Sequence, residues 1–280
     1  MAINQLRIVA IHGNGGGGFR FQWVYQYIPL GVKLQTVTLP GFAGVPADPN
    51  LQTMRDFADY LYGVITEGRR PVVALGTGTG GSMLLEYAQH YPETLNGMIL
   101  HTPVGTGLDT RQFPRLMRLP GMRRTGRKVF SSRIARPVFQ RLVFNDNQEL
   151  PPAYVNHFFD AYGQCTVFDQ MFDLITPDWY ASLKPINVPT ALLWGENDRV
   201  LNVNQIRDYQ RLLRNNVVRI VPGWDHFPMI EQPEAYAREL ISLAKRVIEQ
   251  GAAKNEMNRQ HQPQNGKAKQ KNRKQRVNAK

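Results

Sequence analysis

The sequence predicts an α/β fold in which a mostly parallel β-sheet is covered by helices on both faces. Short runs rich in Val, Ile and Leu alternate along the chain with longer segments of helical period. The short runs are apolar almost throughout, which is typical of strands that are buried on both sides of a parallel sheet. Regular alternation of strand and helix is characteristic of layered α/β proteins.

Six strands and four helices follow from this pattern. The strands are expected at 7–11, 34–39, 71–75, 98–101, 190–194 and 217–221, and the helices near 53–67, 81–90, 204–214 and 233–249. The helix near 53–67 has the clearest period, since its apolar residues recur about every 3.6 positions. They are Met54, Phe57, Ala58, Leu61 and Ile65.

Two segments depart from the alternation. Residues 105–183 have no good strand, and prolines interrupt several pieces of helical period, so we expect a helical cap inserted between two strands. Residues 251–280 have almost no apolar side chain and are expected to be a disordered basic tail. The predicted division is therefore an α/β core over 1–104 and 184–250, a cap over 105–183 and a tail over 251–280.

The net charge of +12 is concentrated in these two segments. Residues 106–144 have ten Lys or Arg and one Asp, and residues 251–280 have nine Lys or Arg and one Glu, whereas the rest is mildly acidic. The cap arginines are consistent with an anionic small-molecule substrate or an anionic membrane surface, and equally with a solvated face. The tail has no aromatic residue for base stacking, so any RNA binding is expected to be weak and salt-sensitive.

Other features bound the location of the protein. The first residues show no signal-peptide pattern, and no stretch approaches the roughly 18 apolar residues of a transmembrane span. Cys165 is the single cysteine, so no disulfide can form within the chain. We therefore expect a cytoplasmic protein.

The segments after four strands have the residues on which chemistry would depend, because ligands of open parallel sheets bind at the carboxyl ends of strands. These segments are His12-Gly13-Asn14-Gly15, Gly76-Thr77-Gly78-Thr79-Gly80, Gly195-Glu196-Asn197-Asp198 and Gly223-Trp224-Asp225-His226. The second enters a helix at once, and the order is glycine turn, then Asp, then His.

This ordered set resembles the α/β-hydrolase superfamily over nearly the whole chain before the tail. The resemblance includes the His-Gly turn after an early strand and the turn Leu39-Pro40-Gly41-Phe42. It also includes the strand–turn–helix around Gly78, which matches the nucleophile elbow G-x-S-x-G, and the order elbow, Asp, His. The histidine segment 222–234 looks like that of many cap-bearing members.

The resemblance implies roles for four positions in acyl-transfer chemistry. His226 would be the general base, and Asp198 the acid that orients it, with Glu196 and Asp225 as nearby rivals. The backbone N–H groups of Asn14 and Thr79 would stabilise an oxyanion.

The elbow departs from the family pattern at its central residue, because Gly78 stands where hydrolytic members have serine. Glycine has no side chain that could attack a substrate. Thr77 and Thr79 are expected to point away from the site and Ser82 to lie one helical step inside, so none is expected to replace the serine. Cys165 is expected to be a buried, unreactive thiol in the cap.

The glycines also fit the dinucleotide pattern G-x-G-x-x-G, at 13–18 and at 76–81. Neither is followed about 20 residues later by the Asp or Glu that would bind a ribose. No Gly-Lys-Ser/Thr follows, and no His/Cys/carboxylate cluster has metal-ligand spacing. We therefore expect no cofactor and no metal.

Three functions remain open. The first is an enzyme that acts on a small carbonyl or ester-type substrate, with His226 and Asp198 as general base and acid and without a serine nucleophile. The second is a catalytically inactive relative that binds a ligand or partner. The third is a serine hydrolase in which Gly78 is an engineered replacement. Because both the Asp and His segments are present, we favour the enzyme.

Overall fold

The computed structural model describes residues 6–68, 71–105, 119, 121–144 and 149–260, with the backbone alone over 254–260. Its centre is a six-stranded sheet in the order β2-β1-β3-β4-β5-β6, in which every neighbouring pair is parallel. The strands are β1 (Leu6–Ile11), β2 (Val32–Val37), β3 (Val72–Thr77), β4 (Gly97–His101), β5 (Thr190–Gly195) and β6 (Asn216–Val221). The α/β fold class and all six expected strands are confirmed, with bounds shifted by one or two residues.

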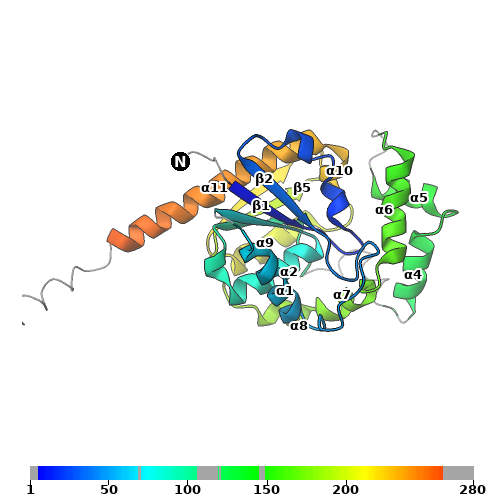
Figure 1. Ribbon diagram of the computed structural model, residues 1–280, viewed down its shortest axis with the longest axis horizontal. Helices are drawn as coiled ribbons and strands as arrows, with labels where there is room; N and C mark the ends of the chain where they lie inside the picture. Colours follow the sequence, from blue (N-terminus) through cyan, green and yellow to red (C-terminus); the bar gives the residue numbers. More distant parts are fainter. Residues whose placement is uncertain (1–5, 69–70, 106–118, 120, 145–148, 261–280) are drawn as a thin grey trace, which may run out of the picture.

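Helices cover both faces of this sheet (Figure 1). One face packs against α1 (Met54–Thr66), α2 (Thr79–His90) and α9 (Ile206–Leu212), and the other against α11 (Pro233–Gln260) and the short α10 (Pro228–Glu231). Along β1, Val9 and Ile11 belong to the first core, whereas Ile8 and Ala10 belong to the second. Burial of successive residues on opposite faces explains why the strand is apolar throughout.

The local sequence of α1 determines both where this helix begins and which of its faces is buried. Thr53 and Asp56 form a capping box, in which each side chain accepts a hydrogen bond from the other residue's backbone N–H. The five apolar residues expected on its inner face are all buried.

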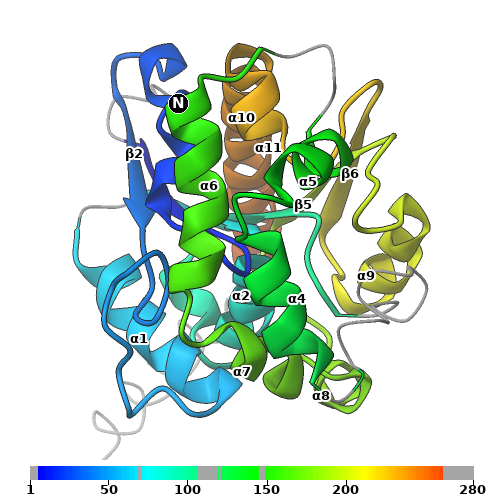
Figure 2. The same cartoon turned by 90° about the vertical axis from the view of Figure 1, so that its right-hand side faces the viewer.

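Between β4 and β5, the described residues form five helices, and we call them the cap helices. They are α4 (Met122–Phe130), α5 (Arg136–Val143), α6 (Pro152–Gln164), α7 (Phe168–Leu174) and α8 (Pro177–Ser182). Helices α4, α5 and α6 form a separate layer beyond the carboxyl ends of the strands (Figures 1 and 2). Their position agrees with the predicted insertion, although 106–118 lie outside the described residues and the domain boundaries stay a prediction.

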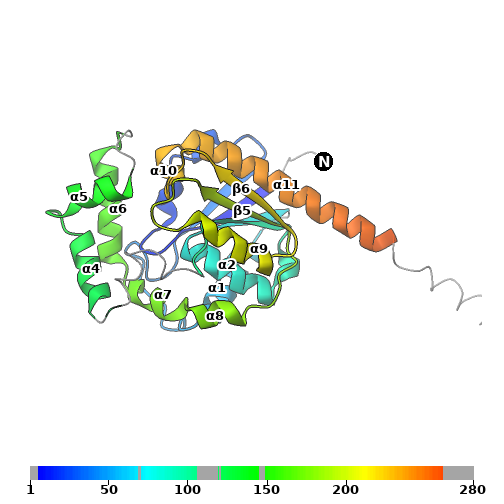
Figure 3. The same cartoon turned by 180° about the vertical axis from the view of Figure 1, so that it is seen from behind.

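Helix α11 corrects the predicted start of the tail. It continues to Gln260, ten residues beyond the end of the predicted core, and its last turns extend away from the sheet (Figure 3). Residues 251–260 are therefore helical, and the expectation of disorder there was wrong. The physical reason is that a packed helix needs no new nucleus to grow, and the added Ala, Lys, Glu and Met are good helix formers. The remainder of the predicted tail, 261–280, lies outside the described residues.

None of the helices in the described ranges combines the length and apolar character required to cross a bilayer.

Candidate active site

The turn between β3 and α2 has the backbone geometry of an elbow. Gly78 has φ +52° and ψ −120°, a conformation that side-chain-bearing residues rarely adopt. The flanking glycines are required by close packing, since a Cβ on Gly76 would lie 2.5 Å from the Gly80 oxygen and one on Gly80 would lie 2.6 Å from the His12 oxygen. Among the atoms that the structure describes, a Cβ on Gly78 would meet only the Gly13 Cα, at 3.4 Å. The central position of the elbow therefore has room for a side chain.

The structure brings His226 and Asp198 together from the ends of β6 and β5. His226 Nδ1 lies 2.8 Å from Asp198 Oδ2. Asp198 is fully buried, and its other oxygen accepts hydrogen bonds from the backbone N–H groups of Val200 and Leu201, at 2.8 and 2.7 Å. Burial opposes ionisation of this carboxyl, but the His226 charge and these hydrogen bonds outweigh it and lower the pKa of Asp198. An ionised Asp198 fixes the proton of His226 on Nδ1 and leaves Nε2 as the acceptor.

The two rival acids are placed differently. Glu196 is exposed. Asp225 forms an ion pair with Arg199 and accepts a hydrogen bond from the backbone N–H of His226, at 2.8 Å. Asp225 thus holds the backbone of the histidine segment, whereas Asp198 contacts the imidazole itself.

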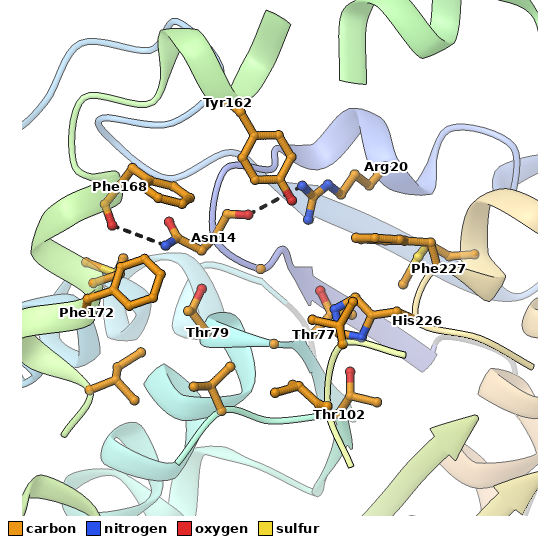
Figure 4. A pocket seen from close by; sticks show the side chains of 18 residues that line it. Asn14, Arg20, Thr77, Thr79, Thr102, Tyr162, Phe168, Phe172, His226 and Phe227 are labelled. Atoms are coloured by element: carbon orange, nitrogen blue, oxygen red, sulfur yellow. Dashed lines mark hydrogen bonds between the residues drawn. The ribbon is translucent and has the colours of Figure 1, made fainter. Parts of the chain in front are cut away.

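Asn14 and Thr79 both line a cavity together with Gly78 and His226 (Figure 4). Within the described part of the chain, neither backbone N–H donates to a protein acceptor. Thr79 begins α2, where first-turn N–H groups are free and the helix dipole favours negative charge. The Asn14 side chain is held by hydrogen bonds from Gly15 N–H and to the Phe168 oxygen, at 3.0 and 3.2 Å.

The hydroxyl groups near the elbow differ in part from expectation. Thr77 and Thr79 were expected to point away, but both line the cavity, because the chain reverses at Gly78 and brings both neighbours to its edge. Thr77 donates to the Ile11 oxygen at 3.4 Å, whereas the Thr79 Oγ1 is buried and has no hydrogen-bond partner among the described residues. Ser82 lies inside the helix, as expected, and donates to the Val104 oxygen.

Cys165 is buried, as expected. Burial is the main cause that raises the pKa of its thiol to about 12, so the reactive thiolate is suppressed at neutral pH.

Two further buried histidines lie near the site, His12 just after β1 and His101 at the end of β4. His12 Nδ1 donates to the Gly13 oxygen at 2.9 Å, and its Nε2 accepts from the Leu39 N–H at 3.1 Å. Burial lowers the pKa of His12 to about 3. Burial and then the charge of His226 lower the pKa of His101 to about 3. Both imidazoles are therefore neutral near pH 7.

The cavity has a volume of about 130 Å³ and a mostly apolar wall. An apolar cavity of roughly 150 Å³ can hold benzene, so this one suits a small or short-chain group. The cap helices supply Tyr162, Phe168, Met171 and Phe172, and the α/β core supplies Val200, Leu201, Phe227 and Met229.

Arg20 also lines the cavity, and the sequence analysis missed it. The available signal was a lone cation within the aromatic segment Phe19-Arg20-Phe21-Gln22-Trp23. Over the described ranges, no group of three or more His, Cys, Asp or Glu side chains could hold a metal ion.

Comparisons with known proteins agree with this architecture. The family model described as the alpha/beta hydrolase family matches residues 8–239. Human monoacylglycerol lipase ABHD6 is 21% identical over 254 residues, which cover 84% of this chain and 74% of the lipase. The putative hydrolase LipZ of Mycobacterium tuberculosis is 23% identical over 171 residues, which cover 59% of this chain and 53% of LipZ.

Solved structures show the same fold. A putative lipase from Acinetobacter baumannii superposes with a TM-score of 0.72 at 21% identity, covering 87% of this chain and 84% of the lipase. A membrane phospholipase A described as a bacterial virulence factor superposes with a TM-score of 0.71 at 23% identity, covering 87% and 79%. Fold, order of segments and family model agree, and the chain belongs to the alpha/beta hydrolase family.

Proposed function

We propose that this protein is an enzyme that acts on a small carbonyl or ester-type substrate without a nucleophile at position 78. The observation that carries the proposal is the 2.8 Å contact between His226 and Asp198 at the edge of a cavity that also contains Gly78. A histidine held by a buried carboxylate can take a proton from a substrate or from water and return it. Glycine at the elbow removes the acyl-enzyme route of serine hydrolases.

The two unused N–H groups give the same site a means of stabilising negative charge. A carbonyl oxygen placed between Asn14 N–H and Thr79 N–H would be polarised by both donors. Removing a proton beside that carbonyl, or adding water to it, develops charge on this oxygen. The proposed chemistry therefore uses His226 for the proton and the two amides for the oxyanion.

The Thr79 hydroxyl is an alternative nucleophile, because it is buried at the cavity and no described residue forms a hydrogen bond with it. A matched test compares the parent chain with His226→Ala and Thr79→Val on a panel of short esters and α-carbonyl acids. We expect His226→Ala to abolish the turnover found and Thr79→Val to retain most of it, since it keeps the backbone N–H. Loss in Thr79→Val equal to that in His226→Ala would move the chemistry to Thr79.

The other two interpretations are separable from this one. An inactive binding protein would hold a ligand in the same cavity with no turnover that depends on His226. A serine hydrolase with an engineered Gly78 would gain ester hydrolysis when serine is restored, but its parent chain would show no turnover that depends on His226. We favour the enzyme, because a carboxylate with a lowered pKa beside a cavity histidine has a use in proton transfer that ligand binding does not require.

A surface of the cap supports a second proposal, association with an anionic membrane. Ile134, Val138 and Leu142 recur every four residues on and just before α5, and they are 93%, 62% and 59% exposed. The same part of the cap has four exposed cations, which are Arg124 and Lys128 on α4, Arg133 just before α5 and Arg141 on α5. An exposed apolar stripe with cations nearby is the pattern of an element that lies in the membrane interface. Binding of RNA by 261–280 and the cytoplasmic location stay predictions from the sequence.

A further inference from the structure

Arg20 is a buried cation at the wall of the cavity. It belongs to the short helix η1 (Gly18–Phe21), and only 4% of its surface is exposed. Among the residues that the structure describes, no carboxylate forms an ion pair with it. Its Nε has no hydrogen-bond partner in the described part of the chain, and one Nη donates to the Asn14 oxygen at the long distance of 3.4 Å. A buried charge with unused donors is costly unless a partner neutralises it.

Aromatic rings surround the guanidinium and leave some of its donors unused. The guanidinium carbon lies 4.9 Å from the ring centre of Phe158, 5.2 Å from that of Phe227 and 5.4 Å from that of Tyr162. Figure 4 shows the guanidinium between Tyr162 and Phe227 at the cavity. Ring faces stabilise positive charge, but they replace few of the hydrogen bonds that water would have made.

The glycine-rich loop after β1 is shaped to admit this arginine. A Cβ on Gly16 would lie 2.7 Å from the guanidinium carbon, so a larger residue there would displace it. A Cβ on Gly13 would lie 3.7 Å from Arg20 Nη1 and 3.6 Å from Gly78 Cα. The guanidinium and the elbow therefore both lie close to the Gly13 Cβ position, and a ligand bound at the elbow could also contact the guanidinium.

We propose that Arg20 binds a carboxylate group of the ligand, and that the substrates of this site are short apolar acids with a carbonyl or ester group. A guanidinium pairs with a carboxylate through two parallel hydrogen bonds. Arg20 is the single Lys or Arg among the described residues that line the cavity, which favours a monoanionic carboxylate over a dianionic phosphate. The inference rests on the proposed function for the reacting group, but the binding step needs no catalysis.

The test is a calorimetric titration of the full-length parent chain with hexanoate and with hexanamide, which have the same carbon chain. We expect hexanoate to bind at least about tenfold more tightly, because hydrogen bonds to a charged partner are stronger. Arg20→Met should lose this preference, and Arg20→Lys should keep part of it. The matched control is Arg238→Met, which removes an exposed arginine paired with Glu234 on α11 and should keep the full preference.

Equal binding of hexanoate and hexanamide by the parent would overturn the proposal. So would an Arg20→Met variant with a native circular-dichroism spectrum and an unchanged preference. If Arg20→Met does not fold, the proposal is judged by two measurements, the ratio of hexanoate to hexanamide affinity in the parent and the same ratio in Arg20→Lys, which should be smaller. His226→Ala should retain hexanoate binding, because the carboxylate is held by Arg20. Loss of turnover in His226→Ala supports the proposed function, whereas a parent chain that turns over substrate but binds hexanoate and hexanamide equally rejects the role of Arg20 alone.

Discussion

Replacing Gly78 by serine should convert this site into an esterase. Among the described atoms, the added Cβ would meet the Gly13 Cα, at 3.4 Å, which is an ordinary van der Waals contact. The backbone angle of +52° is unfavourable for serine and should cost about 1–2 kcal/mol of stability. In a domain of this size that lowers the melting temperature by roughly 2–4 °C for each kcal/mol. The variant should therefore remain folded.

The gain in rate follows from the groups already in place. A serine in this turn would lie in the cavity with His226, and the N–H groups of Asn14 and Thr79 border the same space. Loss of a serine nucleophile costs serine proteases about 10⁶-fold in kcat, so restoring one in an unoptimised site should give about 10³-fold or more over the parent. The assay is release of p-nitrophenol from p-nitrophenyl butyrate.

Two controls make this result interpretable. Gly78→Ala imposes the same backbone strain without a hydroxyl, and Gly78→Ser combined with His226→Ala has the hydroxyl without its base. Gly78→Ala should remain near the level of the parent, and the double variant should not exceed that level. A folded Gly78→Ser protein that is no faster than Gly78→Ala would refute the reasoning that the site is assembled for acyl transfer.

Three more predictions test the supporting structure. Asp198→Asn should lower turnover by about 10³–10⁴-fold, since the amide no longer holds His226 in the required tautomer, and unchanged turnover in this variant would contradict the role of Asp198. Stability should fall with acid, because unfolded histidine takes up a proton below pH 6.5 whereas folded His12 does so only near pH 3. Between pH 7 and pH 5 the free energy of unfolding should fall by roughly 2 kcal/mol for each buried histidine. His12→Gln should show a smaller fall when stability is measured by urea unfolding at both pH values. The same fall in the variant as in the parent would argue against a neutral His12. Leu142→Asp should reduce sedimentation of the protein with anionic vesicles several-fold. The control Leu30→Asp changes an exposed leucine before β2 and should not reduce it. Equal binding of vesicles by the two variants would exclude the α5 stripe as the membrane contact.

The fold was predictable from the sequence because each central strand is buried on both faces. Such strands are apolar without alternation, as β3 and β4 show, and they stand out even in a single sequence. The meeting of Asp198 with His226 was predictable in outline, since the carboxyl ends of parallel strands share one edge of the sheet. The resemblance favoured Asp198 over Asp225 but left Asp225 as a rival, because both follow strand ends and only the turn geometry separates them.

The features that sequence reasoning missed depend on contacts between distant segments. Arg20 is buried because cap residues Phe158 and Tyr162 and the histidine segment's Phe227 close over it. No local pattern specifies that closure. The extension of α11 was missed for a different reason, since polar composition was taken as disorder although the helix continues from a packed first half.

The central claim is that His226 moves protons in this site without a nucleophile at position 78. The most direct measurement is NMR of hydrogen–deuterium exchange beside the carbonyl of short 2-oxo acids and β-keto esters in D₂O, with the parent chain and with His226→Gln. The account predicts that the parent accelerates exchange for at least one compound and that His226→Gln slows it by about 10²-fold or more. Equal exchange rates with the two proteins would contradict it.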